Sequence, residues 1–216
     1  MIGIKTHMKN IDLKRRIIKL SYENKKSHIG SCLSAVDIIE EIYNLKKMDE
    51  KFILSEGHAA VALYCVLEKH EKGNSEYLLK KHGIHPERDE ENGIWCTTGS
   101  LGQGLPIALG MALADRSKNV YCMISDGEAA EGSIWEALRI KTDNNVSNLK
   151  VYINLNGYGA YGKIDSRKLS RRLKAFCPDI NIRKTTVEQL PFLKGLDAHY
   201  HLITKEEYEE ALKLLK

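Results

Sequence analysis

Two polar side chains follow two short apolar segments in this sequence. Asp126, with Gly127 after it, comes directly after residues 120–125, and Asn156 comes directly after residues 150–155. Both segments are continuous apolar runs rich in β-branched residues, which predicts buried strands. A stretch with helical spacing separates them, so the sequence predicts a β-α-β unit. Because ligands of open parallel sheets bind outside the carboxyl ends of the strands, we expect the carboxylate and the carboxamide to share a site.

The chemistry that this pair supports is the binding of magnesium and phosphate. Mg²⁺ prefers hard oxygen ligands and takes one or two of them from the protein, with others from substrate phosphates. The backbone of Gly127 can approach a phosphate closely, and the start of the following helix favours an anion. A helix-capping Asp126 beside an unrelated strand-end Asn156 would give the same pattern. The pair alone therefore leaves both interpretations open.

Three further segments place histidines inside fixed local patterns. They are Lys26–Ser34 with His28, Phe52–His58, and Thr97–Gly104 with His85-Pro86-Glu87 upstream. In this order, and followed by the Asp126…Asn156 pair, they resemble the N-terminal, diphosphate-binding half of transketolase over residues from about 10 to 165. The Thr-Thr-Gly-x-Leu-Gly-Gln-Gly segment distinguishes transketolase from the 2-oxoacid dehydrogenases, which share only the metal motif. It also argues against deoxyxylulose phosphate synthase.

The resemblance implies that thiamine diphosphate and Mg²⁺ are the cofactors. It places Mg²⁺ on the side chains of Asp126 and Asn156 and on the backbone carbonyl of Tyr158. It implies that Gly127 offers its N–H to the diphosphate, and that His58 lies nearest to that group. The loop residues that it places against the aminopyrimidine and thiazolium rings are Gly99 and Leu101.

The resemblance also implies roles for the other motif histidines. His28 and His85 are expected to face the donor and acceptor sugars, since a side chain with a pKa near neutrality can donate to a carbonyl or move a proton. A late family histidine that touches the diphosphate has only His199 and His201 as candidates. Histidines without a motif, expected to be ordinary surface or core residues, are His7, His70 and His82.

Two glutamates have two possible explanations. Glu131 and Glu136 are five residues apart, which places them about 140° from each other on a helix. The resemblance implies that they line a dimer interface and couple two distant cofactors through buried carboxylates and water. A plain preference for acidic residues at a helix start explains Glu128 and Glu131 equally well.

The elements that must position these residues alternate between helix and strand. We expect a three-layer α/β/α thiamine diphosphate-binding fold with a mainly parallel sheet, forming a single domain over residues 1–216. The expected helices are 10–24, 35–45, 58–72, 104–116, 133–142 and 205–216, and the expected strands are 120–125, 150–155 and 181–184.

Composition excludes several classes of function. The net charge of +4 is mild and spread out, so no nucleic-acid partner is expected. The basic runs Lys14-Arg15-Arg16 and Arg171-Arg172 are expected to be solvated helix faces. No secretory signal or membrane span is visible, and the five cysteines have no paired spacing. We therefore expect a cytoplasmic protein with reduced cysteines and no membrane partner.

The sequence departs from the family in one decisive respect. The family needs a glutamate from a second domain to hydrogen-bond the aminopyrimidine, and these 216 residues hold no such domain. We therefore expect one subunit of a split transketolase, which transfers a two-carbon ketol unit between sugars or sugar phosphates. It would be active only with a C-terminal, pyrimidine-binding partner subunit, in a heterotetramer. The loop at 158–162 and the shortened C-terminus are further departures.

Two other functions stay open at this point. One is a subunit of a different thiamine diphosphate carboligase or of a 2-oxoacid decarboxylating enzyme, against which the three motif histidines argue. The other is a cofactor-binding subunit without its own turnover, against which the intact metal pair argues.

Overall fold

The computed structural model describes residues 9–216, so His7 and the first eight positions of the expected domain lie outside the described residues. The α-helices are α1 (Ile11–Glu23), α2 (Ile29–Leu45), α3 (Ala60–Lys69), α4 (Ser75–His82), α5 (Gly104–Ala114), α6 (Gly132–Asp143), α7 (Ser166–Phe176) and α8 (Lys205–Leu214). The strands are β1 (Lys51–Leu54), β2 (Val120–Ser125), β3 (Leu149–Leu155), β4 (Tyr158–Gly159), β5 (Gly162–Lys163) and β6 (Asn181–Lys184). Short 3₁₀ segments are η1 (Gly57–Ala59), η2 (Glu90–Asn92), η3 (Gly127–Ala130) and η4 (Gly195–His199).

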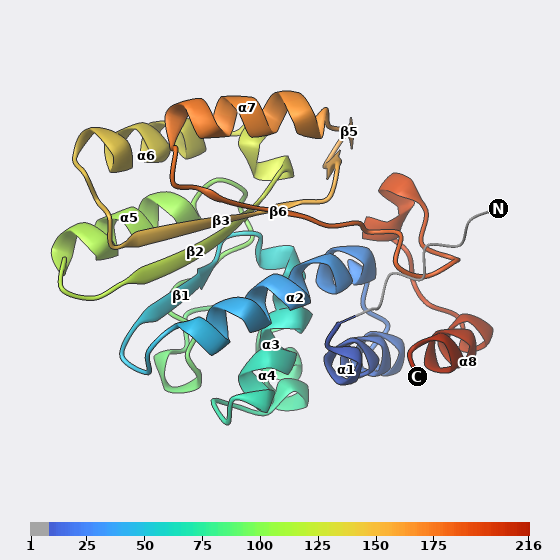
Figure 1. The fold of residues 1–216 in the computed structure, drawn as a ribbon. Helices are drawn as coiled ribbons and strands as arrows, with labels where there is room; N and C mark the ends of the chain where they lie inside the picture. The colour runs from blue at the N-terminus through green and yellow to red at the C-terminus, as the bar shows by residue number, and fades with distance from the viewer. Residues whose placement is uncertain (1–8) are drawn as a thin grey trace.

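A parallel sheet divides the molecule into three layers (Figure 1). Its strand order is β1-β2-β3-β6, and every neighbouring pair is parallel. Helices α5, α6 and α7 cover one face, while α1 to α4 and α8 lie on the other side. A hydrophobic core lies on each side of the sheet, and the strands contribute to both because their side chains alternate between the two faces. Met123 packs in the core with α1 to α3, and Cys122 packs in the core with α5 to α7. The expected three-layer fold is confirmed.

The β-α-β unit has the predicted elements. Strand β2 covers the expected residues, β3 begins one residue early, and α6 extends the expected helix by one residue at each end. All six side chains of β2 are buried, as expected of a strand covered on both faces. The expected strand at 181–184 is β6, at the edge of the sheet.

Several elements differ from the prediction, and helix α7 and the β4–β5 hairpin are not among the expected elements. Helix α2 begins at Ile29 rather than at residue 35, because the small residues of the Lys26–Ser34 motif pack inside the helical layer. The expected helix 58–72 ends at Lys69, and α4 follows as a separate helix after Gly73. Strand β1 is only four residues long, which is too short for its pattern to be distinguished from a buried turn.

The expectation of a solvated face at Lys14-Arg15-Arg16 is wrong. Lys14 is 2% exposed, and its Nζ lies 2.8 Å from Asp37 Oδ2. Arg16 Nε donates to Glu68 Oε2 at 2.9 Å, and Arg15 donates to two backbone carbonyls at the end of α8. Three adjacent cations thus join α1 to three other helices, which a charge pattern read along the sequence does not reveal.

Two further expectations concern the state of the cysteines and the presence of membrane-spanning segments. All five cysteines are free, and only Cys96 among them is not fully buried. Along residues 9–216, the helices are too short or too polar to cross a bilayer.

Candidate functional site

The candidate site lies at the carboxyl ends of the central strands. Chain segments leaving β1, β2 and β3 carry His58, Asp126 and Asn156, respectively. The register of the parallel pairs explains their proximity, since Ser125 of β2 lies opposite Asn154 of β3. The sheet therefore brings together the carboxylate and the carboxamide that the sequence predicted to share a site.

The Asp126 carboxylate is held by backbone donors. It is 1% exposed, and its Oδ1 and Oδ2 accept hydrogen bonds from the N–H groups of Gly127 (3.1 Å) and Gly157 (2.6 Å). Burial nevertheless raises the pKa of Asp126 to about 7. Asn156 is 8% exposed, and its Oδ1 accepts from the N–H of Tyr158 at 3.0 Å. Both side chains are thus fixed by the turn that follows β3.

These residues fit a magnesium ion by their chemistry. Among residues 9–216, no three His, Cys, Asp or Glu side chains converge on one metal position. The expected set needs only one carboxylate, because it adds a carboxamide and a backbone carbonyl. Asp126 forms no ion pair with any described residue, so its buried carboxylate lacks the countercharge that a divalent cation supplies. Hard oxygen donors with few carboxylates suit Mg²⁺, which keeps positions for phosphate oxygens.

Two more carboxyl groups are buried beside Asp126, and sequence reasoning did not assign them to the site. Glu128 accepts hydrogen bonds from Ser55 Oγ (2.6 Å), Gly102 N (2.9 Å) and Ser125 N (3.0 Å). It therefore ties together three chain segments, and its role here is structural. The exposed fraction of Glu56 is 0%. Burial, followed by the charge of Glu128, raises its pKa well above the usual range. We call Glu56, Asp126 and Glu128 the carboxylate side.

Glu56 is joined to the central strand by an asparagine. Asn154 Nδ2 donates to Glu56 Oε1 at 3.2 Å and to Ser34 Oγ at 3.0 Å, and Asn154 Oδ1 accepts from Thr185 Oγ1 at 2.6 Å. Asn154 stands inside an apolar strand, and a polar residue at such a position is the sequence signal that could have revealed this network.

Histidines form the other part of the site. The ring centroids of His28 and His58 are 5.3 Å apart, and that of His199 is 6.4 Å from the first and 6.1 Å from the second. Burial lowers the pKa of His28 to about 4 and that of His58 to about 3, so both rings are neutral at physiological pH. His85 is exposed and lies against Gly99, where an added Cβ would be 3.1 Å from the imidazole ring. We call His28, His58, His85 and His199 the histidine side.

The late histidines have different surroundings. His199 is 9% exposed, its Nδ1 lies 2.6 Å from Ser31 Oγ, and its carbonyl accepts from the N–H of His28 at 2.9 Å. His201 lies 2.8 Å from Glu207 and is not part of the cluster. The histidines expected to be ordinary do pair with local carboxylates: His70 with Glu40 at 3.0 Å and His82 with Asp89 at 3.1 Å.

The Thr97–Gly104 loop rests directly on the segment that carries His58. A Cβ at Gly57 would lie 2.6 Å from the backbone carbon of Thr98, and one at Gly104 would lie 2.6 Å from Ser55 Cα. Only glycine permits these two close approaches. The contact fixes the loop that carries Gly99 and Leu101 relative to the histidines.

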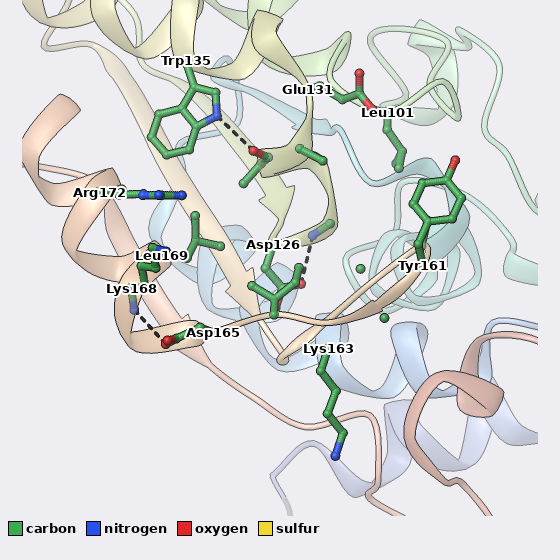
Figure 2. A pocket seen from close by; sticks show the side chains of 17 residues that line it. Leu101, Asp126, Glu131, Trp135, Tyr161, Lys163, Asp165, Lys168, Leu169 and Arg172 are labelled. Carbon is green, nitrogen blue, oxygen red and sulfur yellow. Dashed lines mark hydrogen bonds between the residues drawn. The ribbon is translucent and has the colours of Figure 1, made fainter.

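A cavity of about 490 Å³ adjoins Asp126 and Gly127 (Figure 2). Leu101 and Glu131 form part of its wall, together with the β4–β5 hairpin and the start of α7. None of the four histidines lines it. Glu136 is exposed on α6 and does not line the cavity either, so the described chain does not bring the two predicted interface glutamates into one site.

Comparison with known proteins places this geometry in context. The profile described as "Transketolase, thiamine diphosphate binding domain" matches residues 21–178. "Transketolase-like protein 2" of Mus musculus is 34% identical over 155 residues, which cover 62% of this chain and 25% of that protein. One subunit of the apulose-4-phosphate transketolase of Phocaeicola vulgatus is 31% identical over 163 residues, which cover 66% of this chain and 58% of that one.

Solved structures agree on the fold. A transketolase from Campylobacter jejuni superposes with a TM-score of 0.77 at 20% identity, covering 99% of this chain and 43% of that chain. In sequence, the matched region covers only 25% of the length of the transketolase-like protein from Mus musculus.

Proposed function

Because this chain belongs to the transketolase family through its thiamine diphosphate-binding domain, we propose that it is the cofactor-binding subunit of a two-subunit transketolase. Such an enzyme transfers a two-carbon ketol unit between sugars or sugar phosphates. The observation that carries the proposal is the meeting of Asp126 and Asn156 at the ends of β2 and β3, beside a partly buried cluster of His28, His58 and His199.

We assign the cofactor residues by the resemblance to the family, and the proximity of Asp126 and Asn156 supports that assignment. Asp126, Asn156 and the Tyr158 carbonyl would hold Mg²⁺. The Gly127 N–H, which donates to Asp126 Oδ1 at 3.1 Å in the free chain, would donate to the diphosphate instead. Gly99 and Leu101, fixed by the loop contacts described above, lie against the rings. When bound, thiamine diphosphate supplies the electron sink for cleaving and forming carbon–carbon bonds.

The histidine side binds and orients the substrate and exchanges protons with it. His28 and His58 are neutral, so each ring has one nitrogen that donates and one that accepts. His58 serves the diphosphate end, while His28 and the exposed His85 face the sugars. His199 joins this group because Ser31 fixes its ring through Nδ1.

The proposal includes a partner. We place the aminopyrimidine glutamate in a pyrimidine-binding subunit, and a relative that is itself named as one subunit of a transketolase supports a two-subunit enzyme. Glu131 and Glu136 are exposed in the single chain, so both are accessible to a second subunit in a heterotetramer. We further propose that residues 1–216 form one domain and that the protein is cytoplasmic, in keeping with its five free cysteines.

The test is reconstitution. The purified chain alone should show no ketol transfer, and co-expression with the pyrimidine-binding subunit should restore it in a screen of sugars and sugar phosphates. A matched preparation carrying Asp126→Ala controls for transfer by contaminating host enzymes. Robust turnover by the isolated chain would contradict the two-subunit proposal.

A further inference from the structure

Helix α7 has a strongly basic exposed face. Its eleven residues include five Lys or Arg side chains and no Asp or Glu, while the net charge of the whole chain is only +4. Leu169 and Leu173 are buried and attach the helix to the core beside α6. The cations that lie exposed on the remaining surface are Arg167, Lys168, Arg171, Arg172 and Lys174.

These cations form no salt bridge within the described chain, although the backbone N–H of Lys168, followed by the charges of Lys168 and Arg167, lowers the pKa of the nearby Asp165 at the start of α7. Across residues 9–216, Arg167, Lys168, Arg171 and Arg172 form no ion pair, and Lys174 is bonded only to backbone carbonyls. Like charges spaced three and four residues apart on a helix repel one another. Most of this face is therefore unpaired in the isolated chain, in contrast to the paired cations of α1.

The basic face borders the 490 Å³ cavity, whose lining mixes charged residues with large apolar side chains. Lys168, Leu169 and Arg172 of α7 line it, and Trp135 of α6 lies on the same side (Figure 2). Two contacts fix Trp135. Its Nε1 donates to the Ala129 carbonyl at 2.9 Å, and its ring packs edge-on against Phe176 with the ring centroids 5.0 Å apart. The cavity thus offers a rigid apolar seat next to unpaired cations.

We propose that the exposed face of α7 and the adjoining cavity dock an acidic segment of the partner subunit, with an apolar side chain of that segment seated on Trp135 and Leu169. The proposal rests on the proposed function for the identity of the partner. Its position follows from the cavity, which also contacts Asp126 and Gly127, so a subunit that covers the cofactor site lies beside α7. A nucleic acid is a less suitable occupant, since the net charge of the whole chain is only +4 and the basic face is confined to one helix.

The experiment measures the affinity of the full chain for the pyrimidine-binding subunit by titration calorimetry at low and high NaCl. The variant Arg167→Glu/Arg171→Glu reverses two charges on α7. The matched control, Lys80→Glu/Lys213→Glu, reverses two exposed helix cations that also lack ion pairs within the described residues. We expect the α7 variant to bind about 10-fold or more weakly and to lose most of the salt dependence, while the control stays within about 2-fold of wild type. Thermal melting of each isolated variant checks that it is folded.

Ketol transfer at saturating partner concentration separates this proposal from the proposed function. Weaker, salt-insensitive binding with normal turnover at saturation supports docking on α7. Equal losses in the α7 variant and the control, or no loss in either, would overturn docking and leave the function standing. Binding that depends on α7 without any ketol transfer would support docking and overturn the function. If the wild-type chain does not bind the partner at any salt concentration, both are wrong.

Discussion

Glu56 and Asp126 of the carboxylate side and His28 and His58 of the histidine side lie close together, yet burial acts on their pKa values in opposite directions. It raises the pKa values of Glu56 and Asp126 and lowers those of His28 and His58, because a low-dielectric environment disfavours the charged form of each group. These four groups are therefore shifted towards neutrality in the free chain. We therefore expect the carboxyl groups to become fully charged only when a cationic ligand binds beside them.

The two sides also differ in how they are held. Backbone N–H groups fix the Asp126 carboxylate, whereas His28 Nδ1 is buried without any hydrogen-bond partner among the described residues. A buried nitrogen with no partner is costly unless something else uses it. The carboxylate side is thus organised for a fixed ligand, and the histidine side keeps an atom available for a substrate.

The largest effect is expected from the carboxylate side. Asp126→Ala should abolish Mg²⁺-dependent thiamine diphosphate binding in the assembled enzyme, since it removes the only carboxylate of the metal set. Titration calorimetry with and without Mg²⁺ measures this, and His28→Ala is the matched control that should retain affinity. Unchanged affinity in Asp126→Ala would show that the metal assignment is wrong.

Substitutions on the histidine side should separate turnover from binding. His28→Ala and His85→Ala should each lower kcat by about 10²–10⁴, the usual cost of losing a positioned acid or base, with cofactor affinity near wild type. Steady-state kinetics at saturating cofactor provide the measurement. If both variants lose cofactor affinity and keep their turnover at saturation, the assigned roles are reversed.

The opposite pKa shifts predict opposite pH dependences of stability in the cofactor-free chain. His58 has a folded pKa of about 3, so as pH falls below about 6.5 the unfolded chain binds a proton that the folded chain does not, and stability decreases. His58→Gln should remove about 1–3 kcal/mol of this acid destabilisation. Urea unfolding at a series of pH values between 8 and 5 provides the measurement.

Glu56 should show the reverse trend. Its folded pKa is raised, so stability decreases as pH rises above the unfolded value, and Glu56→Gln should stabilise the chain more at pH 8 than at pH 5. The same urea series tests it. If the change in the free energy of unfolding followed the same pH dependence in the His58 and Glu56 variants, the predicted contrast between the two sides would be wrong.

The smallest effect concerns a single hydrogen bond. Ser31→Ala removes the contact with His199 Nδ1 and should cost about 1 kcal/mol of stability, a typical value for one hydrogen bond. In the active complex, it should lower kcat only modestly, because it frees the His199 ring without removing it. A loss of turnover as large as that of His28→Ala would mean that Ser31 itself contacts the substrate.

Local patterns predicted the parts of the site that lie close together in the sequence. Asp126 and Asn156 could be paired in advance because a β-α-β unit places consecutive strand ends side by side. Glu56 could not be assigned, because its burial depends on Asn154, which is 98 residues away. His199 reaches the cluster only through the packing of η4 on α2, and Lys14 is buried only because Asp37 lies opposite. Long-range packing, rather than propensity, decided these positions.

The strand order has a consequence for biosynthesis. Lys51 of β1 pairs with Val120 of β2, so β1 has no sheet partner until the ribosome has made the following seventy or so residues. At typical rates of about 5–20 residues per second, this takes several seconds, during which Phe52–Leu54 remains an uncovered apolar edge. Helices α1 to α3 can already pack on one another in that interval. The nascent chain should therefore be most dependent on chaperones just before β2 emerges.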